Sequence, residues 1–414
     1  MRMKFNKSGQ LLLVSAVSLL LATFVTACET LTVDFVFVTS SKAAGPNNYG
    51  EVDVFEVNSE SGFMRQIPTS PFPSGGRNPV AESVSSDNTN LYVVNHDDNS
   101  IVQFVIGNDG KVYPQNTVNT PGIYPIAVTV NGLNLFVLDT YQPLPGCSTA
   151  APCSGSVAVL PITVSSGSPP SDSLGAPITQ GSLNYWPLSL PGSPNDIIVP
   201  TGINVLASGG EVFVSAYDST VTPNRGYVFA FTATSSGALS PVNGGAPFAA
   251  GTNPSAIASD PSGSYVYVTD ATSSNLLGFS VKSGLLSPLS GSPFPTGNQP
   301  SAIAIDPSYP YLYVTNALDS TVSAYSISNG VLARLGSYAT GLQPVAIGID
   351  PSTNHFLYTV NFLGTQVNGT VSGFELSTTA GTLLNSQNSP YISQALPTAV
   401  AAIPHNGTGA GVTK

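Results

Sequence analysis

The chain has 414 residues, and 22 acidic against 11 basic residues give it a net charge of −11 at pH 7. Only 8% of its residues are charged, so it offers no basic patch of the kind that nucleic acids require, and nucleic acid is excluded as a partner. An acidic surface is also repelled by anionic lipid, which excludes attachment to a membrane by charge.

The N-terminus has the pattern of an export signal. Arg2, Lys4 and Lys7 precede an apolar stretch from 11 to 25 that ends in small residues, and this stretch is short for a membrane span of about 20 residues. The letters VTAC, ending at Cys28, resemble the bacterial lipobox, in which the cysteine is acylated. The resemblance implies an exported lipoprotein of the cell envelope, in the outer membrane if the cell is Gram-negative. An ordinary cleavage site and an uncleaved anchor are the alternatives.

One unit recurs seven times along the rest of the chain. Each copy opens with a proline followed by a short aliphatic run, such as PSAIA, and these anchors are Pro79, Pro125, Pro200, Pro254, Pro300, Pro344 and Pro397. A turn follows, best preserved as Asp-Pro-Ser at Asp260, where the aspartate can hydrogen-bond the backbone ahead. Next comes an alternating run such as YVYVTD, which is typical of a strand packed on both faces.

A third run and a weaker fourth run complete each unit, so every copy supplies four short strands. The anchors lie 44 to 75 residues apart, near the size of a propeller blade. The last anchor strand, at Pro397, has no strands after it, and the run DFVFVTS from 34 to 40 has no anchor before it. The two ends therefore complete one blade and remove exposed sheet edges. We predict an all-β fold, a seven-bladed β-propeller of four-stranded antiparallel blades.

The letters LYVTN, AIAIDPS and GSPFPTGNQP resemble the YVTN-repeat and lactonase (6-phosphogluconolactonase-like) propellers. The resemblance covers about residues 35–404 and implies the fold more strongly than the reaction, because one fold hosts many functions. We expect four parts: a signal peptide over 1–27, a lipidated tether over 28–34, the propeller over 35–404 and a flexible tail over 405–414.

The third residue after each anchor sets one unit apart. It is Glu82 in the unit of Pro79 and a branched aliphatic residue in the other six. A buried carboxylate tends to have a raised pKa, as general acids and bases need. Arg77 and His96 fall in loops of the same unit at the same channel mouth. The lactonase resemblance implies a catalytic cluster, with Glu82 or His96 activating water and Arg77 holding an oxyanion. The alternative is a structural pair of Glu82 and Arg77 beside an ordinary loop histidine.

Other polar residues at this mouth are candidates for ligand binding. Arg225 is one of three cations there, with Lys42 and Arg77, that could meet a phosphate. Aspartate or asparagine ends the second strand of five units, at Asn95, Asp139, Asp270, Asn316 and Asn361. We expect these side chains to cap turns, and the alternative is a ring of oxygens that binds Ca²⁺. No cofactor is required, and no transition metal is expected because the three histidines fall in different units.

The unit of Pro125 carries two insertions. The one from 165 to 199 holds Tyr185 and the only tryptophan, Trp186, which could form a sugar-stacking platform over the mouth or a hydrophobic plug. The other holds Cys147 and Cys153, which an exported protein could join in a disulfide. Two free thiols or a weak metal pair are the alternatives.

Two functions from different classes follow. The first is a monomeric, lipid-anchored propeller that binds a small molecule, a glycan or an envelope protein, with the membrane reached only through the lipid. The second is a hydrolase that opens a neutral, sugar-type lactone at the channel mouth. A phosphorylated lactone is not expected, because the electrostatic field is acidic. We favour binding, and a position of Glu82 away from Arg77 and His96 would remove the reason for the catalytic interpretation.

Overall fold

A computed structural model describes residues 32–42, 48–58, 60–164, 172–350, 356–363, 368–393 and 395–404. The chain divides into an N-terminal part, residues 1–32, and a second unit, residues 33–414. The predicted signal peptide, Cys28 and the predicted tail from 405 onward lie outside the described residues. No helix among the residues that the structure describes has the length and apolarity needed to cross a membrane.

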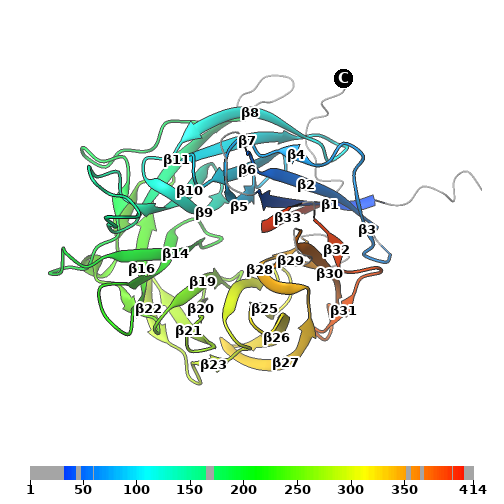
Figure 1. Ribbon diagram of the computed structural model, residues 1–414. Coiled ribbons are helices and arrows are strands. Elements are labelled where there is room, and N and C mark those ends of the chain that lie inside the picture. Colours follow the sequence, from blue (N-terminus) through cyan, green and yellow to red (C-terminus); the bar gives the residue numbers. More distant parts are fainter. Residues whose placement is uncertain are drawn as a thin grey trace, which may run out of the picture. The chain divides into compact units, whose positions relative to one another are not determined.

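Seven antiparallel sheets form a ring, which confirms the seven-bladed β-propeller (Figure 1). Blades are numbered here from the anchor Pro79. The first contains β5 (Pro79–Val84), β6 (Asn90–Asn95), β7 (Ser100–Ile106) and β8 (Val112–Asn119). The second contains β9 (Ile123–Asn131), β10 (Asn134–Tyr141), β11 (Ser156–Val164), β12 (Asp172–Leu174) and β13 (Trp186–Pro187). The third contains β14 (Ile198–Val205), β15 (Glu211–Asp218), β16 (Arg225–Ala233), β17 (Leu239–Pro241), the 3₁₀ turn η1 (Asn243–Gly245) and β18 (Phe248–Ala249).

The remaining blades repeat this order. The fourth contains β19 (Pro254–Ser259), β20 (Tyr265–Asp270), β21 (Asn275–Lys282), β22 (Leu285–Pro288) and β23 (Phe294–Pro295). The fifth contains β24 (Pro300–Ile305), β25 (Tyr311–Asn316), β26 (Thr321–Ser328) and β27 (Val331–Ala339). The sixth contains β28 (Leu342–Ile349), β29 (Phe356–Leu363), β30 (Thr370–Leu376), β31 (Leu383–Asn385) and β32 (Tyr391–Ile392). The closing blade contains β33 (Leu396–Pro404), β1 (Thr32–Ser41), β2 (Glu51–Asn58), β3 (Met64–Gln66) and β4 (Phe72–Pro73).

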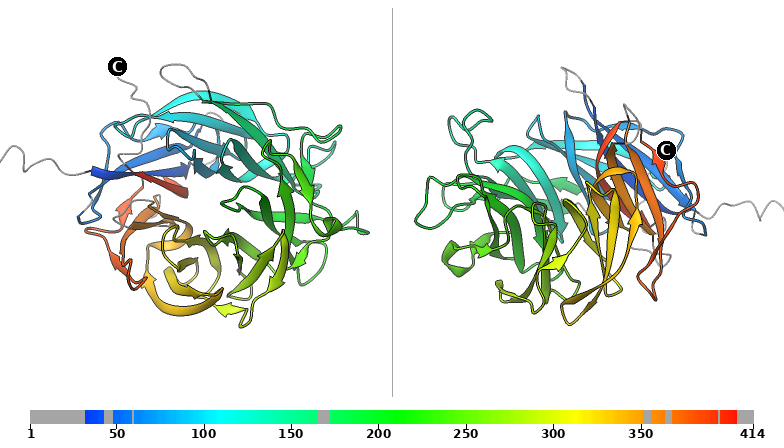
Figure 2. Two further views of the ribbon diagram at one scale, coloured as in Figure 1. Left: turned by 180° about the vertical axis from the view of Figure 1, so that it is seen from behind. Right: turned by 60° about the horizontal axis from the view of Figure 1, so that its bottom comes forward.

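The anchor strands line the centre of the ring. The strands β5, β9, β14, β19, β24, β28 and β33 each pack against the next, and β33 packs against β5 (Figure 2). The predicted aspartate turns also form, since Asp260 Oδ1 accepts the backbone N–H of Tyr265 at 2.6 Å. Strand order therefore places the loop before each anchor strand and the loop between second and third strands at one mouth.

Aromatic side chains of the second strands fill the space between blades. Tyr267 and Tyr313 have no exposed surface, and burying side chains of this kind stabilises the fold by roughly 2–3 kcal/mol each. Their hydroxyl groups donate to carbonyls in turns of the following blade, at 2.9 Å to Gly330 and 3.1 Å to Gly381. The alternating runs thus supply apolar packing and a polar contact to the neighbouring blade.

The two ends of the folded unit close the ring as predicted. Strand β1 pairs with β33 from Asp34 opposite Pro404 to Ser41 opposite Leu396. Thr398, which follows the last anchor, donates to the carbonyl of Thr39 at 3.0 Å and to that of Pro79 at 2.8 Å. The closing blade is therefore tied both within itself and to the first blade.

The bond from Thr398 to Pro79 has equivalents in two other blades. Ser255 donates to the carbonyl of Pro300 at 2.6 Å, and Ser301 donates to that of Pro344 at 2.7 Å. In each case the hydroxyl residue after one anchor proline bonds the anchor proline of the next blade. At these three positions a small polar side chain links successive anchor strands.

Replacing Thr398 with valine tests this closure. The substitution keeps the shape and removes both hydrogen bonds, so we expect a loss of about 1–2 kcal/mol in the free energy of unfolding. Urea denaturation measures it. Thr163→Val, at an exposed position of β11, is the matched control and should change stability by less than about 0.5 kcal/mol. Equal effects of the two variants would contradict the role of Thr398.

Candidate functional site

Glu82 lies on the anchor strand β5 and faces the closing blade. Its Oε2 accepts the hydroxyl of Thr39 at 2.6 Å, and the backbones of Thr39 and Ala401 also hydrogen-bond the carboxyl group. Burial raises the pKa of Glu82 to about 7, although these hydrogen bonds oppose the rise. Its Oε1 is buried without a hydrogen-bond partner among the described residues. The carboxyl group thus contacts both strands that close the ring.

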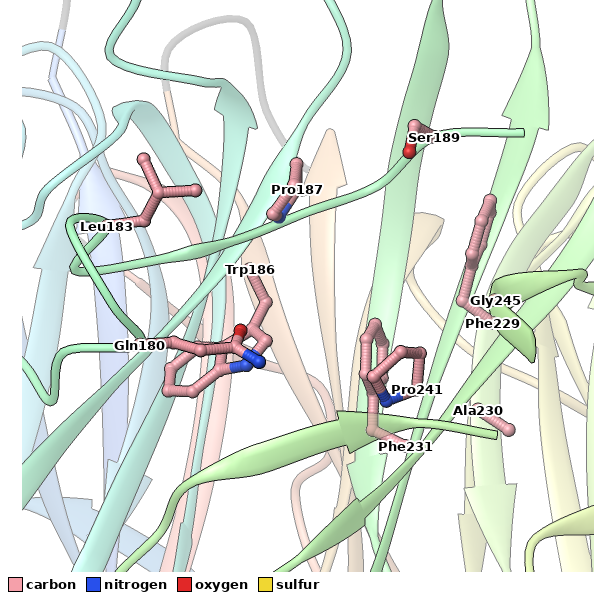
Figure 3. A pocket seen from close by; sticks show the side chains of 10 residues that line it. All are labelled: Gln180, Leu183, Trp186, Pro187, Ser189, Phe229, Ala230, Phe231, Pro241 and Gly245. Carbon is pink, nitrogen blue, oxygen red and sulfur yellow. The ribbon is translucent and has the colours of Figure 1, made fainter. Parts of the chain in front are cut away.

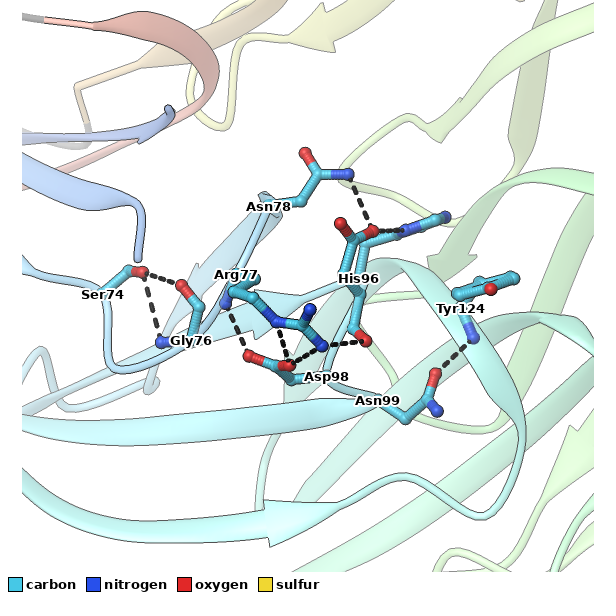
Figure 4. A network of polar contacts seen from close by, with 9 residues as sticks. Ser74, Gly76, Arg77, Asn78, His96, Asp98, Asn99 and Tyr124 are labelled. Atoms are coloured by element: carbon cyan, nitrogen blue, oxygen red, sulfur yellow. Dashed lines mark hydrogen bonds and ion pairs between the residues drawn. The ribbon is translucent and has the colours of Figure 1, made fainter. Parts of the chain in front are cut away.

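Arg77 is bound on the outer side of the first blade by Asp98. Its backbone N–H and its Nε donate to that carboxylate at 2.7 Å and 2.6 Å, and its Nη2 also reaches the carbonyl of Asp97 (Figure 4). The guanidinium lines a hollow of about 450 Å³ that extends to Thr117 and Asn119 on β8, the outermost strand. The hydrogen bonds to Asp98 raise the pKa of Arg77 further.

His96 lies on the side of this polar network nearer the second blade and is linked to Arg77 through Asp97. Its Nδ1 lies 2.7 Å from Oδ1 of Asp97, which also accepts the side-chain amide of Asn78 at 3.1 Å. Burial opposes ionisation of Asp97, but the hydrogen bonds from His96 and Asn78 outweigh it and lower its pKa. The imidazole stacks on Tyr124, with ring centroids 4.6 Å apart and planes 6° apart.

The structure links two residues of the predicted trio, because Arg77 and His96 both contact Asp97. No hydrogen bond or ion pair among the described residues joins Glu82 to Arg77 or His96. The alternative pair of Glu82 and Arg77 is also not formed, because each side chain has another partner. Comparison of the internal repeats placed all three residues in one blade but could not show where their side chains point. The direction of the Glu82 side chain depends on which face of β5 lies toward β1.

Tyr124 is the residue of this region that the sequence analysis missed. Its ring lies between His96 and Tyr141, whose centroid is 6.0 Å away. It precedes an anchor proline and has a φ of 57°, which is rare for a bulky residue. The residues before three other anchors share a positive φ: Asn78, Gln299 and Gln343. The sequence does show this difference, because Tyr124 is aromatic whereas the residues at the equivalent position before those three anchors carry side-chain amides.

Three of the five strand-end side chains, those of Asp139, Asp270 and Asn316, accept backbone N–H groups of the loop before the anchor strand. The amide atoms of Asn95 have no hydrogen-bond partner among the described residues, and Asn361 bonds Thr370 and Ser372. Asp270 accepts the backbone N–H groups of Thr252 and Asn253 at 2.7 Å and 3.1 Å, and Asn316 accepts that of Gly297 at 2.9 Å. The glycine of each Gly-x-x-Pro motif lies against such a side chain, at a distance that leaves no room for a Cβ atom. The side chains of Asp270 and Asn316 are therefore engaged within their own blades.

No metal cluster supports the Ca²⁺ alternative. Within the described ranges, no three or more histidine, cysteine, aspartate or glutamate residues are grouped so that they could hold a metal ion. Asp139, the strand-end residue of the second blade, is buried, and burial raises its pKa to about 7. Its Oδ2 accepts the backbone N–H of Gly122 at 3.2 Å. Below pH 7 this carboxyl group is mainly protonated, and a protonated carboxyl group is a poor cation ligand.

Tyr185 and Trp186 are buried, with 6% and 2% of their surfaces exposed. The indole Nε1 of Trp186 donates to the carbonyl of Leu239 in the third blade at 2.8 Å. The expectation of an exposed stacking platform over the mouth is therefore wrong, and the plug alternative describes these rings. The insertion packs inward because Trp186 pairs with Val157 of β11 and its ring joins the core between two blades.

Arg225 and the two cysteines lie where the sequence placed them. Arg225 is exposed at the start of β16, opposite Asp218, and it belongs to none of the ion pairs among the described residues. Its ligand-binding role stays a prediction. Cys147 and Cys153 form the predicted disulfide within the loop after β10.

Comparison with known proteins agrees with this architecture. The family described as lactonase, seven-bladed β-propeller, matches residues 227–401. The fold is that of a lactonase-type β-propeller. No curated protein matches the chain in sequence.

Solved structures resemble this lactonase-type propeller over nearly its whole length. A putative 6-phosphogluconolactonase from Bacteroides fragilis is 18% identical, with 90% of this chain and 99% of that chain covered and a TM-score of 0.67. A periplasmic gluconolactonase from Pseudomonas aeruginosa is 16% identical, with 89% and 99% covered and a TM-score of 0.65. A hypothetical selenium-binding protein from Sulfolobus tokodaii is 10% identical, with 92% and 95% covered and a TM-score of 0.61. At these identities the likeness shows the fold alone.

The burial of Glu82 predicts a pH-dependent stability. Between its ordinary pKa of 4.5 and its folded pKa of about 7, the folded chain holds a proton that the unfolded chain has released. Stability from Glu82 is therefore present below pH 4.5 and is lost as the pH rises through 7. Relative to wild type, Glu82→Gln should gain about 3 kcal/mol in unfolding free energy between pH 4.5 and pH 8.

Urea denaturation at several pH values measures this difference. Asp139 titrates in both proteins, so the difference isolates Glu82. The control Glu375→Gln, at an exposed position of β30, should give a constant difference from wild type across the range. A constant difference for Glu82→Gln as well would contradict the raised pKa.

Proposed function

We propose that this lactonase-type propeller is a binding module that takes a neutral sugar at the mouth of its first and second blades. The observation that carries the proposal is the cluster of His96, Tyr124, Tyr141, Asp97 and Asn78. A sugar ring offers apolar C–H faces and a rim of hydroxyl groups, which match aromatic rings flanked by a carboxylate and an amide.

The state of the other candidate residues supports binding over catalysis. The two carboxyl oxygens of Glu82 are not presented to a substrate, because Oε1 is buried and Oε2 is bound by Thr39. Arg77 is neutralised by Asp98, at 2.5 Å, and is not free to hold an oxyanion. The cluster around His96 is open to solvent, since 26% of the His96 side chain and 37% of the Asp97 side chain are exposed.

The location proposed for this module is the cell envelope. The export signal and the lipobox-like sequence at Cys28 support a lipid-anchored protein, which acts as a monomer. Such a protein meets sugars, glycans and envelope proteins outside the cytoplasm. Among these we choose sugars because the mouth cluster is small and aromatic and carries a carboxylate and an amide beside its rings.

Binding of free sugars tests the proposal. Saturation-transfer NMR with glucose, galactose, mannose and N-acetylglucosamine should detect at least one of them. Tyr124→Ala should weaken that binding about tenfold or more, since it removes the central ring. Tyr309→Ala, at an exposed position in the turn before β25, is the control and should leave binding unchanged. Absence of binding to all four sugars, or equal effects of the two variants, would contradict a sugar site at His96.

Hydrolysis of a neutral lactone is the second candidate, and the carboxyl group of Glu82 favours it. A pKa of about 7 suits a general base near neutral pH, and Glu82 is the only carboxylate at this position of the repeat. In such a reaction Glu82 would exchange its bond with Thr39 for a water molecule, which it would activate to attack the lactone carbonyl.

Turnover of D-glucono-1,5-lactone separates the two candidates. If the hydrolase assignment holds, acid release above the spontaneous rate should fall at least a hundredfold in Glu82→Gln and persist in Glu375→Gln. Thermal unfolding of both variants controls for loss of structure. If the wild-type protein releases no acid above the spontaneous rate, the hydrolase assignment is contradicted and binding is the function that remains.

A further inference from the structure

A groove runs along the outer flank of the ring between the second and third blades, away from the channel mouth cluster. It encloses about 310 Å³, and its apolar walls come from Leu183, Trp186 and Pro187 on one side and Phe229, Phe231 and Pro241 on the other (Figure 3). Gln180 and Ser189 are the polar side chains at its edge. This volume lies at the small end of the range for ligand pockets, which begins near 300 Å³.

The walls of the groove are fixed before any ligand arrives. Trp186 is held by its hydrogen bond to Leu239 of β17, and its ring packs in one core cluster with Phe229 and Phe231. Phe229 and Phe231 are each 4% exposed. With Trp186 2% exposed, these rings offer a ligand little surface, but the wall that they form is already ordered.

Comparison with the other blades shows that the groove lacks a hydrogen-bond acceptor that they have. In three other blades, the serine of a Ser-Pro pair accepts a backbone N–H from the third strand. These bonds run from Val54 to Ser70 at 2.8 Å, from Gly278 to Ser292 at 3.0 Å and from Gly373 to Ser389 at 3.0 Å. Pairing of β16 with β18 places Ala230 at the equivalent donor position. The residue before Pro247 is Ala246, which has no hydroxyl group.

The free donor points into the groove. The carbonyl of Ala230 accepts the N–H of Val242 at 2.9 Å, so this residue directs its polar groups to the outer edge of β16. On an antiparallel strand the N–H and C=O of one residue point to the same edge. Strands β17 and β18 pair with β16 on either side of Ala230 and leave a gap there. We find no acceptor for the Ala230 N–H among the residues that the structure describes, and Ala230 lines the groove.

We propose that this groove binds a neutral aromatic carbonyl compound, whose ring lies between Trp186 and Phe231 and whose oxygen accepts the Ala230 N–H. An acceptor is required because the Ala230 N–H, for which we find no partner among the described residues, is a donor, and a buried donor without a partner is costly. A neutral group is required because no basic residue lines the groove and the chain carries a net charge of −11.

Acetophenone and ethylbenzene test the proposal, because they share a shape and differ in the carbonyl oxygen. Trp186 is the only tryptophan, so its indole N–H gives a single, assigned signal in ¹H–¹⁵N spectra of the protein. Titration should shift this signal, and acetophenone should bind about fivefold tighter than ethylbenzene, as one neutral hydrogen bond provides. Equal affinities, or no shift of the signal with either compound, would overturn the proposal.

Two matched serine variants locate the binding. Ser189→Phe places a ring at the exposed edge of the groove and should weaken acetophenone binding at least tenfold. Ser287→Phe, on the exposed outer strand β22 of the next blade, should leave it unchanged. The wild-type position of the free Trp186 signal in both variants checks that the groove remains folded. Unchanged binding in Ser189→Phe would place the ligand elsewhere and overturn the assignment.

Discussion

The pairing of β1 with β33 is the interaction on which every other part of the fold depends. A ring of seven sheets exists only while its first and last sheets stay joined, and here that joint consists of strands from opposite ends of the folded unit. Thr398 ties β33 to β1 and to Pro79, and Glu82 contacts β1 through Thr39. The residue that looked most like a catalyst therefore belongs to the closure.

The fold could be read from the sequence because its information is repeated. The anchor prolines, the aspartate turns and the alternating runs recur along the chain. A strand that is unclear in one unit can therefore be assigned from the equivalent strand of another unit. The closure of the ring could be predicted because the first strand at Pro397 has no second strand after it, and the second-strand run from 34 to 40 has no first strand before it. Repetition specifies the ring in this way without reference to side-chain directions.

The candidate site was harder to predict because it consists of departures from the repeat. Glu82 was visible as the one carboxylate among aliphatic siblings, but its partner depends on the face that β5 turns toward the closing blade. Trp186 was visible as the only tryptophan, yet its burial depends on how an insertion without siblings folds back onto β11. Tyr124 was overlooked because an aromatic residue in a strand is usually a core residue, and the sequence does not show that its backbone is left-handed.

The disulfide also bears on where this protein can keep its fold. Cys147 and Cys153 are 6 positions apart and close a short loop outside the strands, and short closed loops restrict an unfolded chain less than long ones. The seven blades are held by strand pairing and by aromatic packing, neither of which involves sulfur. Reducing agents would therefore loosen one surface loop and leave the ring intact, so the architecture does not rely on an oxidising environment.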